Sequence, residues 1–180
     1  MSKNVTSFNA SKGYGEKGVK IVEQYLNGPR STGFTLNVES NDGFRLLDVD
    51  LIYWNNNLRK LEMIEVKFDS HTYSNNIFVE TISNENTGKP GYIYSTEADY
   101  IYYLFDNSLV LYIIPVTDFR VWFIENIDRF HEVSSYTGED KVLYKSIGKL
   151  VPISVMINEV KNIEIKFLEE ESPAELLLTI

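Results

Sequence analysis

The stretch from Asp48 to Asp69 constrains the fold of this chain more than any other. It reads Asp48-Val-Asp-Leu-Ile-Tyr-Trp, then Asn55-Asn-Asn-Leu-Arg-Lys, then Leu61-Glu-Met-Ile-Glu-Val-Lys-Phe-Asp69. Two runs of β-branched and aromatic residues joined by an asparagine-rich segment are typical of a β-hairpin. Side chains two residues apart on a strand share one face of the sheet. One face of this hairpin is apolar throughout and predicts a core; it carries Val49, Leu51, Tyr53, Ile64, Val66 and Phe68.

The opposite face of the hairpin gathers charged side chains. Glu65 and Lys67 share it, and Asp50 lies on the same face of the first strand. If the strands pair antiparallel, the aspartate comes close to Glu65 and Lys67. Carboxylates bind Mg²⁺, which activates water and stabilises charge in phosphodiester hydrolysis, and a neighbouring lysine orients that water. The pattern therefore indicates a hydrolytic Mg²⁺ site with Asp50 and Glu65 as ligands, Lys67 beside them and the Val66 carbonyl as a further ligand.

Two points stay open at this hairpin. Asp48 also lies on the charged face and is the reserve for Asp50, which is preferred because apolar or aromatic residues follow it into the strand. The other alternative is a solvated face of an edge hairpin, on which Asp48, Asp50, Glu65 and Lys67 only form cross-strand ion pairs. The presence of Ile52 among these charges is unusual for a plain solvent face.

The rest of the chain alternates between helical and extended hydrophobic periods. The pattern predicts helices over 11–27, 96–106 and 118–130, and strands over 34–38, 44–54, 60–68, 76–83 and 109–115. Further on, 134–138 resembles a loop, 143–146 a short strand, 148–154 a segment that pairs with another edge, and 158–167 favours a final helix over a strand.

This order of elements predicts an α/β fold with a mixed central sheet flanked by helices. No linker divides the 180 residues, so we expect a single domain over 1–180, with a core at about 11–130 and a C-terminal elaboration over 131–180.

The composition excludes several classes of protein. The chain has no cysteine, so a disulfide framework, a thiolate zinc site and a cysteine nucleophile are ruled out. No apolar run approaches the roughly 18 residues of a membrane span, and the polar N-terminus has no secretory pattern, so we expect no membrane association and a cytoplasmic location. The net charge of −9 argues against a protein that coats nucleic acid by charge alone.

Three charged residues outside the hairpin are candidate members of the site. Glu16 lies on the first predicted helix, and its alternative role is an ordinary pair with Lys20 one turn later. Glu80 lies among apolar residues on the strand 76–83 and points either into the site or at solvent. Lys89 lies in a loop rich in glycine and proline, where it contacts a phosphate or is simply a surface lysine. His71 and His131 are too isolated for a paired metal site.

A glutamate on the first helix, an aspartate and a Glu-x-Lys motif occur in this order, as Glu16, Asp50 and, after fourteen intervening residues, Glu65-Val66-Lys67. This pattern resembles the PD-(D/E)XK nuclease superfamily, whose fold is a restriction-endonuclease-like αβββαβ core. The resemblance covers roughly residues 11–120. The runs 76–84, 88–91 and 98–100 are similar to a phage and bacterial subgroup of restriction-endonuclease-like proteins. No proline precedes Asp48 or Asp50, which departs from the motif and leaves the choice of aspartate open.

The resemblance implies an Mg²⁺-dependent nuclease, with Mn²⁺ as a substitute, that hydrolyses DNA phosphodiester bonds as an endonuclease. Asp50, Glu65 and the Val66 carbonyl bind the metal, with Glu80 and Asp48 as further candidates. Lys67 serves the water and the transition state, and Glu16 assists the metal or its water shell. Contacts to DNA are expected from Lys12, Lys17, Lys20 and Lys89.

Homodimerisation is compatible with this reading, because one such site cuts one strand. The alternative function is a catalytically inactive nuclease-fold protein that binds a nucleic acid or a host protein. A third possible function is that of a small structural or interaction domain, in which the hairpin carboxylates have no catalytic or binding role.

Overall fold

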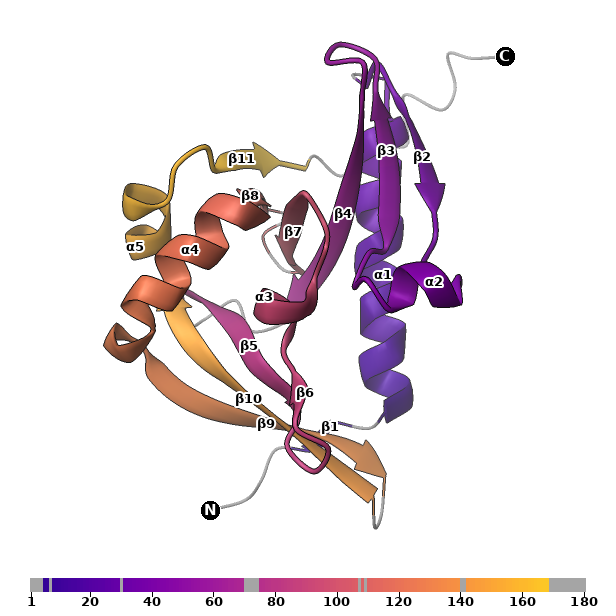
Figure 1. Cartoon of the computed structure of the whole chain (residues 1–180). Coiled ribbons are helices and arrows are strands. Elements are labelled where there is room, and N and C mark those ends of the chain that lie inside the picture. Colours follow the sequence, from indigo (N-terminus) through magenta and orange to yellow (C-terminus); the bar gives the residue numbers. More distant parts are fainter. Residues whose placement is uncertain are drawn as a thin grey trace.

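The computed structural model describes residues 5–6, 8–29, 31–69, 75–106, 108, 110–139 and 142–168. Its helices are α1 (Phe8–Asn27), α2 (Asp42–Arg45), α3 (Tyr92–Ser95), α4 (Val116–Asn126) followed by a 3₁₀ turn (Ile127–Arg129), and α5 (Ile153–Glu159). Its strands form two sheets, shown in Figure 1.

A six-stranded mixed sheet, here the central sheet, has the order β11-β8-β7-β4-β3-β2. Its strands are β2 (Phe34–Asn37), β3 (Leu51–Asn55), β4 (Lys60–Asp69), β7 (Tyr100–Phe105), β8 (Val110–Pro115) and β11 (Glu164–Phe167). Neighbouring strands are antiparallel except β4 and β7, which are parallel.

A second sheet has the order β1-β9-β10-β5-β6. Its strands are β1 (Val5–Thr6), β5 (Asn76–Asn84), β6 (Lys89–Pro90), β9 (His131–Glu139) and β10 (Val142–Pro152). The connection between the parallel strands β4 and β7 therefore runs through β5, β6 and the four-residue helix α3. Because β10 pairs with β5 and β11 pairs with β8, the C-terminal part of the chain takes part in both sheets.

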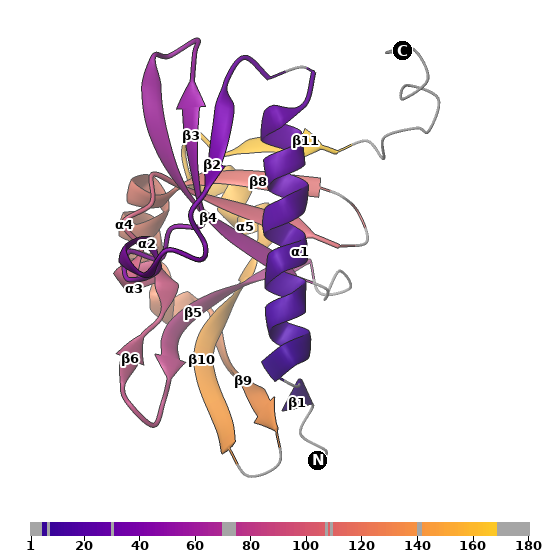
Figure 2. The same ribbon diagram turned by 90° about the vertical axis from the view of Figure 1, so that its right-hand side faces the viewer.

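The central sheet is covered on both faces. Helix α1 packs on one face through Val19, Val22 and Leu26, which recur at helical spacing and are buried against Leu51, Ile64, Val66 and Leu104. The other face packs against β5, β10, α3, α4 and α5, with Ile77, Ile93, Phe119 and Met156 fully buried among them. Figure 2 shows α1 on one side of the central sheet and α3 and α4 on the other.

These observations confirm the mixed α/β class and the mixed central sheet flanked by helices. The helix over 11–27, the strands over 34–38, 60–68, 76–83 and 109–115, and the helix over 118–130 are found close to their expected bounds. No helix in the described part of the chain is long and apolar enough to cross a lipid bilayer.

Four expectations were wrong. The helix over 96–106 is the buried strand β7, and the loop at 134–138 belongs to strand β9. The final helix over 158–167 is instead the end of α5, a turn and strand β11. The strand over 44–54 begins only at Leu51, because the Asn41 side chain caps α2 by accepting hydrogen bonds from the backbone N–H groups of Gly43 and Phe44.

Candidate functional site

Asp50 lies directly before β3, and its backbone hydrogen bonds continue the pairing of the central sheet. Its N–H donates to the Ile64 carbonyl and its carbonyl accepts from the Val38 N–H, both at 2.9 Å. Its carboxylate oxygen Oδ2 accepts a hydrogen bond of 2.8 Å from the Val66 N–H on β4. The aspartate side chain is thereby held across the hairpin, beside Glu65.

Glu65 and Lys67 form the other half of this cluster, on β4. The Glu65 side chain is almost fully buried, and the Lys67 Nζ lies 2.5 Å from its Oε1. The same Nζ lies 4.6 Å from the centre of the Tyr92 ring, on α3, in a cation–π contact. The ammonium group is thus held between a carboxylate and an aromatic face, while the lysine side chain stays 31% exposed.

The two carboxyl groups lie within hydrogen-bonding reach of each other, and both are hard to ionise. Burial raises the pKa of Asp50, although Lys67 and the Val66 N–H oppose the shift. Burial also raises the pKa of Glu65, to about 8; Lys67 opposes this and the nearby Asp50 charge adds to it. Burial alone would lower the pKa of Lys67, but the charge of Glu65 and its hydrogen bond raise it instead. One lysine therefore does not compensate the negative charge of the pair.

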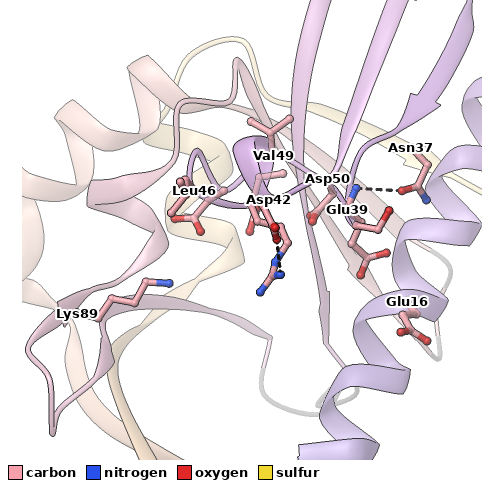
Figure 3. A pocket seen from close by; sticks show the side chains of 12 residues that line it. Glu16, Asn37, Glu39, Asp42, Leu46, Val49, Asp50 and Lys89 are labelled. Carbon is pink, nitrogen blue, oxygen red and sulfur yellow. Dashed lines mark hydrogen bonds and ion pairs between the residues drawn. The ribbon is translucent and has the colours of Figure 1, made fainter.

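Asp50 and Glu65 border a cavity of about 930 Å³ at the end of the central sheet. Figure 3 shows Glu16, on α1, at one side of this cavity and Lys89 at the opposite side. The wall carries six carboxylates and two basic side chains, and the lining residues are Glu16, Asn37, Glu39, Ser40, Asp42, Arg45, Leu46, Asp48, Val49, Asp50, Glu65 and Lys89. Below, we call it the acidic cavity.

Asp48 lines the acidic cavity but does not belong to the strand, contrary to the expectation that it shares a strand face with Asp50. It sits in a turn with a left-handed φ of 48°. Its carboxylate accepts a hydrogen bond from the Ser95 hydroxyl, and its carbonyl accepts one of 2.8 Å from Thr96 Oγ1. Asp48 therefore ties the turn before β3 to the end of α3, and Asp50 is the aspartate in contact with Glu65.

Glu80 lies on β5, where its charge interacts with that of Lys67. Burial raises its pKa, while the Lys67 charge and side-chain hydrogen bonds with Ser83 and Ser146 oppose the shift. Its charge in turn helps to raise the pKa of Lys67. Glu80 therefore interacts with Lys67 and does not line the acidic cavity.

Of the four lysines expected to contact DNA, Lys89 lines the acidic cavity. Lys17 forms an ion pair of 2.6 Å with Asp106, and Lys20 is exposed on α1. The side chain of Lys12 lies outside the described residues.

Sequence reasoning missed Arg45 and Tyr92. Arg45 lies on α2 and is the second basic residue on the cavity wall, with an exposed ion pair of 3.1 Å to Asp42. The sequence signal for Arg45 was Asn41, which caps the short helix α2; in the sequence alone, the same residues resemble a turn. Tyr92 gave no signal, because its ring reaches Lys67 only through the fold.

The donor set suits a hard divalent cation. In the described ranges, no three histidine, cysteine, aspartate or glutamate side chains are grouped so that they could hold a metal ion together. Mg²⁺ is usually held by one or two carboxylates together with several waters, so two carboxylates at the edge of an open cavity match its needs. The adjacent pair Asp50 and Glu65 provides them, and a cation there would favour the ionised forms of both carboxyl groups, whose pKa values burial raises.

Comparison with known proteins adds no relative: no protein-family model, no curated protein and no solved structure matches the chain.

Proposed function

We propose that this protein is an Mg²⁺-dependent nuclease of PD-(D/E)XK type that hydrolyses DNA phosphodiester bonds as an endonuclease. The observation that carries the proposal is the meeting of Asp50 and Glu65 at the edge of the acidic cavity, with the Lys67 ammonium 2.5 Å from Glu65. Together they form the set of side chains that metal-assisted phosphodiester hydrolysis requires.

Asp50 and Glu65 would hold the metal ion. When bound, Mg²⁺ supplies positive charge that lowers the pKa of a water and stabilises the developing charge on the phosphate. Lys67, whose ammonium group is held by Glu65 and the Tyr92 ring, would donate N–H groups to the attacking water or a phosphate oxygen. Glu16, which lines the cavity from α1, would accept hydrogen bonds from the water shell of the metal. The Val66 carbonyl and Asp48 remain candidate ligands.

The order of elements supports a restriction-endonuclease-like core. Helix α1 is followed by the antiparallel strands β2, β3 and β4, and β4 pairs in parallel with β7. Within the αβββαβ core, the four-residue helix α3 occupies the place of the second helix, and β5 and β6 precede it. Glu65 lies on β4 and Asp50 directly before β3, and these two strands are the middle pair of the four strands β2, β3, β4 and β7.

The test is cleavage of supercoiled, linear and branched DNA with Mg²⁺ or Mn²⁺. Wild type is compared with Asp50→Asn, Glu65→Gln and Lys67→Ala, and with Glu164→Gln on the distant strand β11 as a matched control. We expect each of the first three substitutions to lower the cleavage rate by about 100-fold or more, since each removes a charge from the reacting centre. The control variant should cleave like wild type. Equal cleavage by all variants would assign the activity to another site or to a contaminant.

The wall of six carboxylates favours a second candidate function, binding without cleavage. Phosphate groups are repelled by such a wall unless cations neutralise it, so a protein partner of opposite charge would also fit. Failure of the wild-type protein to cleave any DNA form or RNA with either metal would favour this function. Calorimetric binding of Mg²⁺ in the same preparation would show that the metal site itself is intact.

A further inference from the structure

We infer that the chain has a second ligand site, which takes a small organic cation, on the α1 face of the central sheet. The site is a cavity of about 340 Å³, below called the tyrosine pocket. It is lined by Tyr25, Leu26, Ser31, Thr32, Tyr53, Asn55, Asn57, Leu58, Glu62, Tyr100, Tyr102, Ile113, Glu164 and Lys166. It shares no lining residue with the acidic cavity and does not depend on the proposed nuclease function.

The strand register builds the floor of the tyrosine pocket. Tyr53 on β3 lies directly opposite Glu62 on β4, and Tyr102 on β7 lies opposite Ile113 on β8, which in turn faces Glu164 on β11. Cross-strand partners point to the same face of a sheet, so these side chains form adjacent rows. The roof comes from Tyr25 and Leu26 in the last turn of α1 and from the following segment at 31–32. Figure 2 shows this end of α1 beside β11.

Four tyrosines give the pocket aromatic walls. Tyr53 and Tyr102 are buried, while Tyr25 and Tyr100 are half-buried. The Tyr53 hydroxyl is hydrogen-bonded to Ser31 Oγ at 2.9 Å, which fixes one wall to the segment after α1. Aromatic faces carry negative charge density and attract ammonium or guanidinium groups. A cluster of tyrosines around a small cavity therefore favours a cation with an apolar body.

Glu62 supplies the anionic group of the pocket. It is only 5% exposed, and burial raises its pKa, a shift that a hydrogen bond with Asn55 opposes. Within the described residues no lysine or arginine lies within 4.0 Å of its carboxylate: Lys60 pairs with Asp99 at 3.2 Å and Lys166 pairs with Glu164 at 2.7 Å. The charge of Lys60 also opposes the rise in the pKa of Glu62, but Lys60 is paired with Asp99, so a bound cation would add to the compensation of the Glu62 carboxylate.

The size and chemistry of the pocket define the ligand class. Pockets of a few hundred Å³ hold small molecules rather than polymer segments. The two basic side chains near Glu62 are already paired, and the walls combine π faces with hydroxyl and amide groups. The ligand we expect is an amine or quaternary ammonium compound with a compact apolar or aromatic body.

Titration calorimetry with two pairs of charged and neutral isosteres tests this site. The pairs are choline with 3,3-dimethylbutan-1-ol, and benzylamine with benzyl alcohol, at neutral pH. We expect wild type to bind the cation of each pair about ten-fold more tightly than its neutral isostere. In Glu62→Gln the cation preference should fall to the smaller part that the tyrosine rings supply, while in Asp50→Asn, which alters the other cavity, it should persist at the wild-type level. The four affinities, of cation and neutral isostere for wild type and for Glu62→Gln, form a cycle that isolates the interaction between the ligand charge and the Glu62 charge, as in a double-mutant cycle.

Methyl NMR of the wild-type protein keeps the test decisive if Glu62→Gln does not fold. Choline should shift the methyl signals of Leu26 and Ile113, which line the pocket, and leave those of Ile77 and Ile93 in the other core unchanged. Three outcomes would each overturn the inference. They are equal affinity of wild type for cation and isostere, a cation preference in Glu62→Gln as large as in wild type, and failure of wild type to bind any of the four compounds.

Discussion

Glu65 combines deep burial with a neighbouring carboxylate, and this sets how the protein responds to pH. Its pKa in the folded protein is raised from 4.5 to about 8, chiefly by burial. Between these two values the folded state keeps a proton that the unfolded state has lost. Folding stability of the metal-free protein therefore falls as pH rises through this interval, and the full stability is present only below it.

The first prediction concerns Glu65→Gln, which keeps the shape of the side chain and removes the titration. Without divalent metal, wild type should lose roughly 2–4 kcal/mol of unfolding free energy between pH 5 and pH 8.5, and the variant clearly less. Denaturant unfolding in EDTA at both pH values measures this. Repeating it with Mg²⁺ should reduce the wild-type loss, since a bound cation favours the ionised pair. An identical pH response in variant and wild type would contradict the assigned role of Glu65.

At the scale of elements, the approach of α1 to β4 depends on one glycine. Gly18 is buried in the face of α1 that meets β4, and a Cβ added there would lie 2.5 Å from the Cβ of Phe68. Phe68 follows Lys67 directly, so the same contact sets the distance of the helix from the strand that carries the site. Gly15, three residues earlier on the same helix, has open space around it.

Gly18→Ala and Gly15→Ala form a matched pair for the second prediction. Alanine favours a helix interior over glycine by about 1 kcal/mol, so Gly15→Ala should stabilise the protein by up to that amount. Gly18→Ala should instead destabilise it by about 1–3 kcal/mol, because Phe68 must move in a packed interior. Urea unfolding of the three proteins measures both signs. Stabilisation by both substitutions would mean that Phe68 can move to accommodate the added methyl group without loss of unfolding free energy.

Helix α1 and strand β4 were predicted from a clear amphipathic period and β8 from a nearly continuous apolar run, whereas β7 and β9 lack a clear period. Asp50, Glu65 and Lys67 could be predicted to meet because the hairpin β3–β4 is local and alternates regularly. Strand β7 reads Tyr-Ile-Tyr-Tyr-Leu-Phe and is buried on both faces, so no alternation marks it, and the chance spacing of Ala98, Ile101 and Phe105 imitates a helix. Strand β9 was not predicted because most of its described side chains are polar and exposed, so it has no apolar face to mark it. The contact of Tyr92 with Lys67 and the electrostatic interaction of Glu80 with Lys67 arise only from tertiary packing.

On the scale of the whole molecule, the charge distribution opposes the proposed substrate. The net charge is −9, and the acidic cavity carries six carboxylates against Arg45 and Lys89. A nucleic acid approaching Asp50 and Glu65 meets repulsion unless divalent cations occupy the carboxylates. If the proposed function holds, metal binding is therefore a condition for substrate binding as well as for catalysis.

The third prediction follows from this repulsion. Ca²⁺ takes oxygen ligands as Mg²⁺ does, with a more flexible geometry, and serves to separate binding from cleavage. A fluorescent DNA duplex should bind about ten-fold more tightly in Ca²⁺ than in EDTA at equal ionic strength, and Asp50→Asn should remove most of the difference. Fluorescence anisotropy gives both affinities. Equal affinity with and without Ca²⁺ would place the DNA contacts away from the acidic cavity.

The pairing of β5 with β10 has a consequence for the order in which the protein folds. Asp50, Glu65 and Lys67 lie on a local hairpin, whereas Glu80 faces Gly148 across 68 residues of chain. Contacts between distant residues require the closure of a long loop and tend to form late. We expect Ile64→Val, in the hairpin, to slow folding, and Val151→Ala, in β10, mainly to speed unfolding. Stopped-flow kinetics would show whether the hairpin that carries Glu65 and Lys67 forms before the second sheet, which carries Glu80. Equal slowing of folding by both substitutions would mean that the two sheets assemble together.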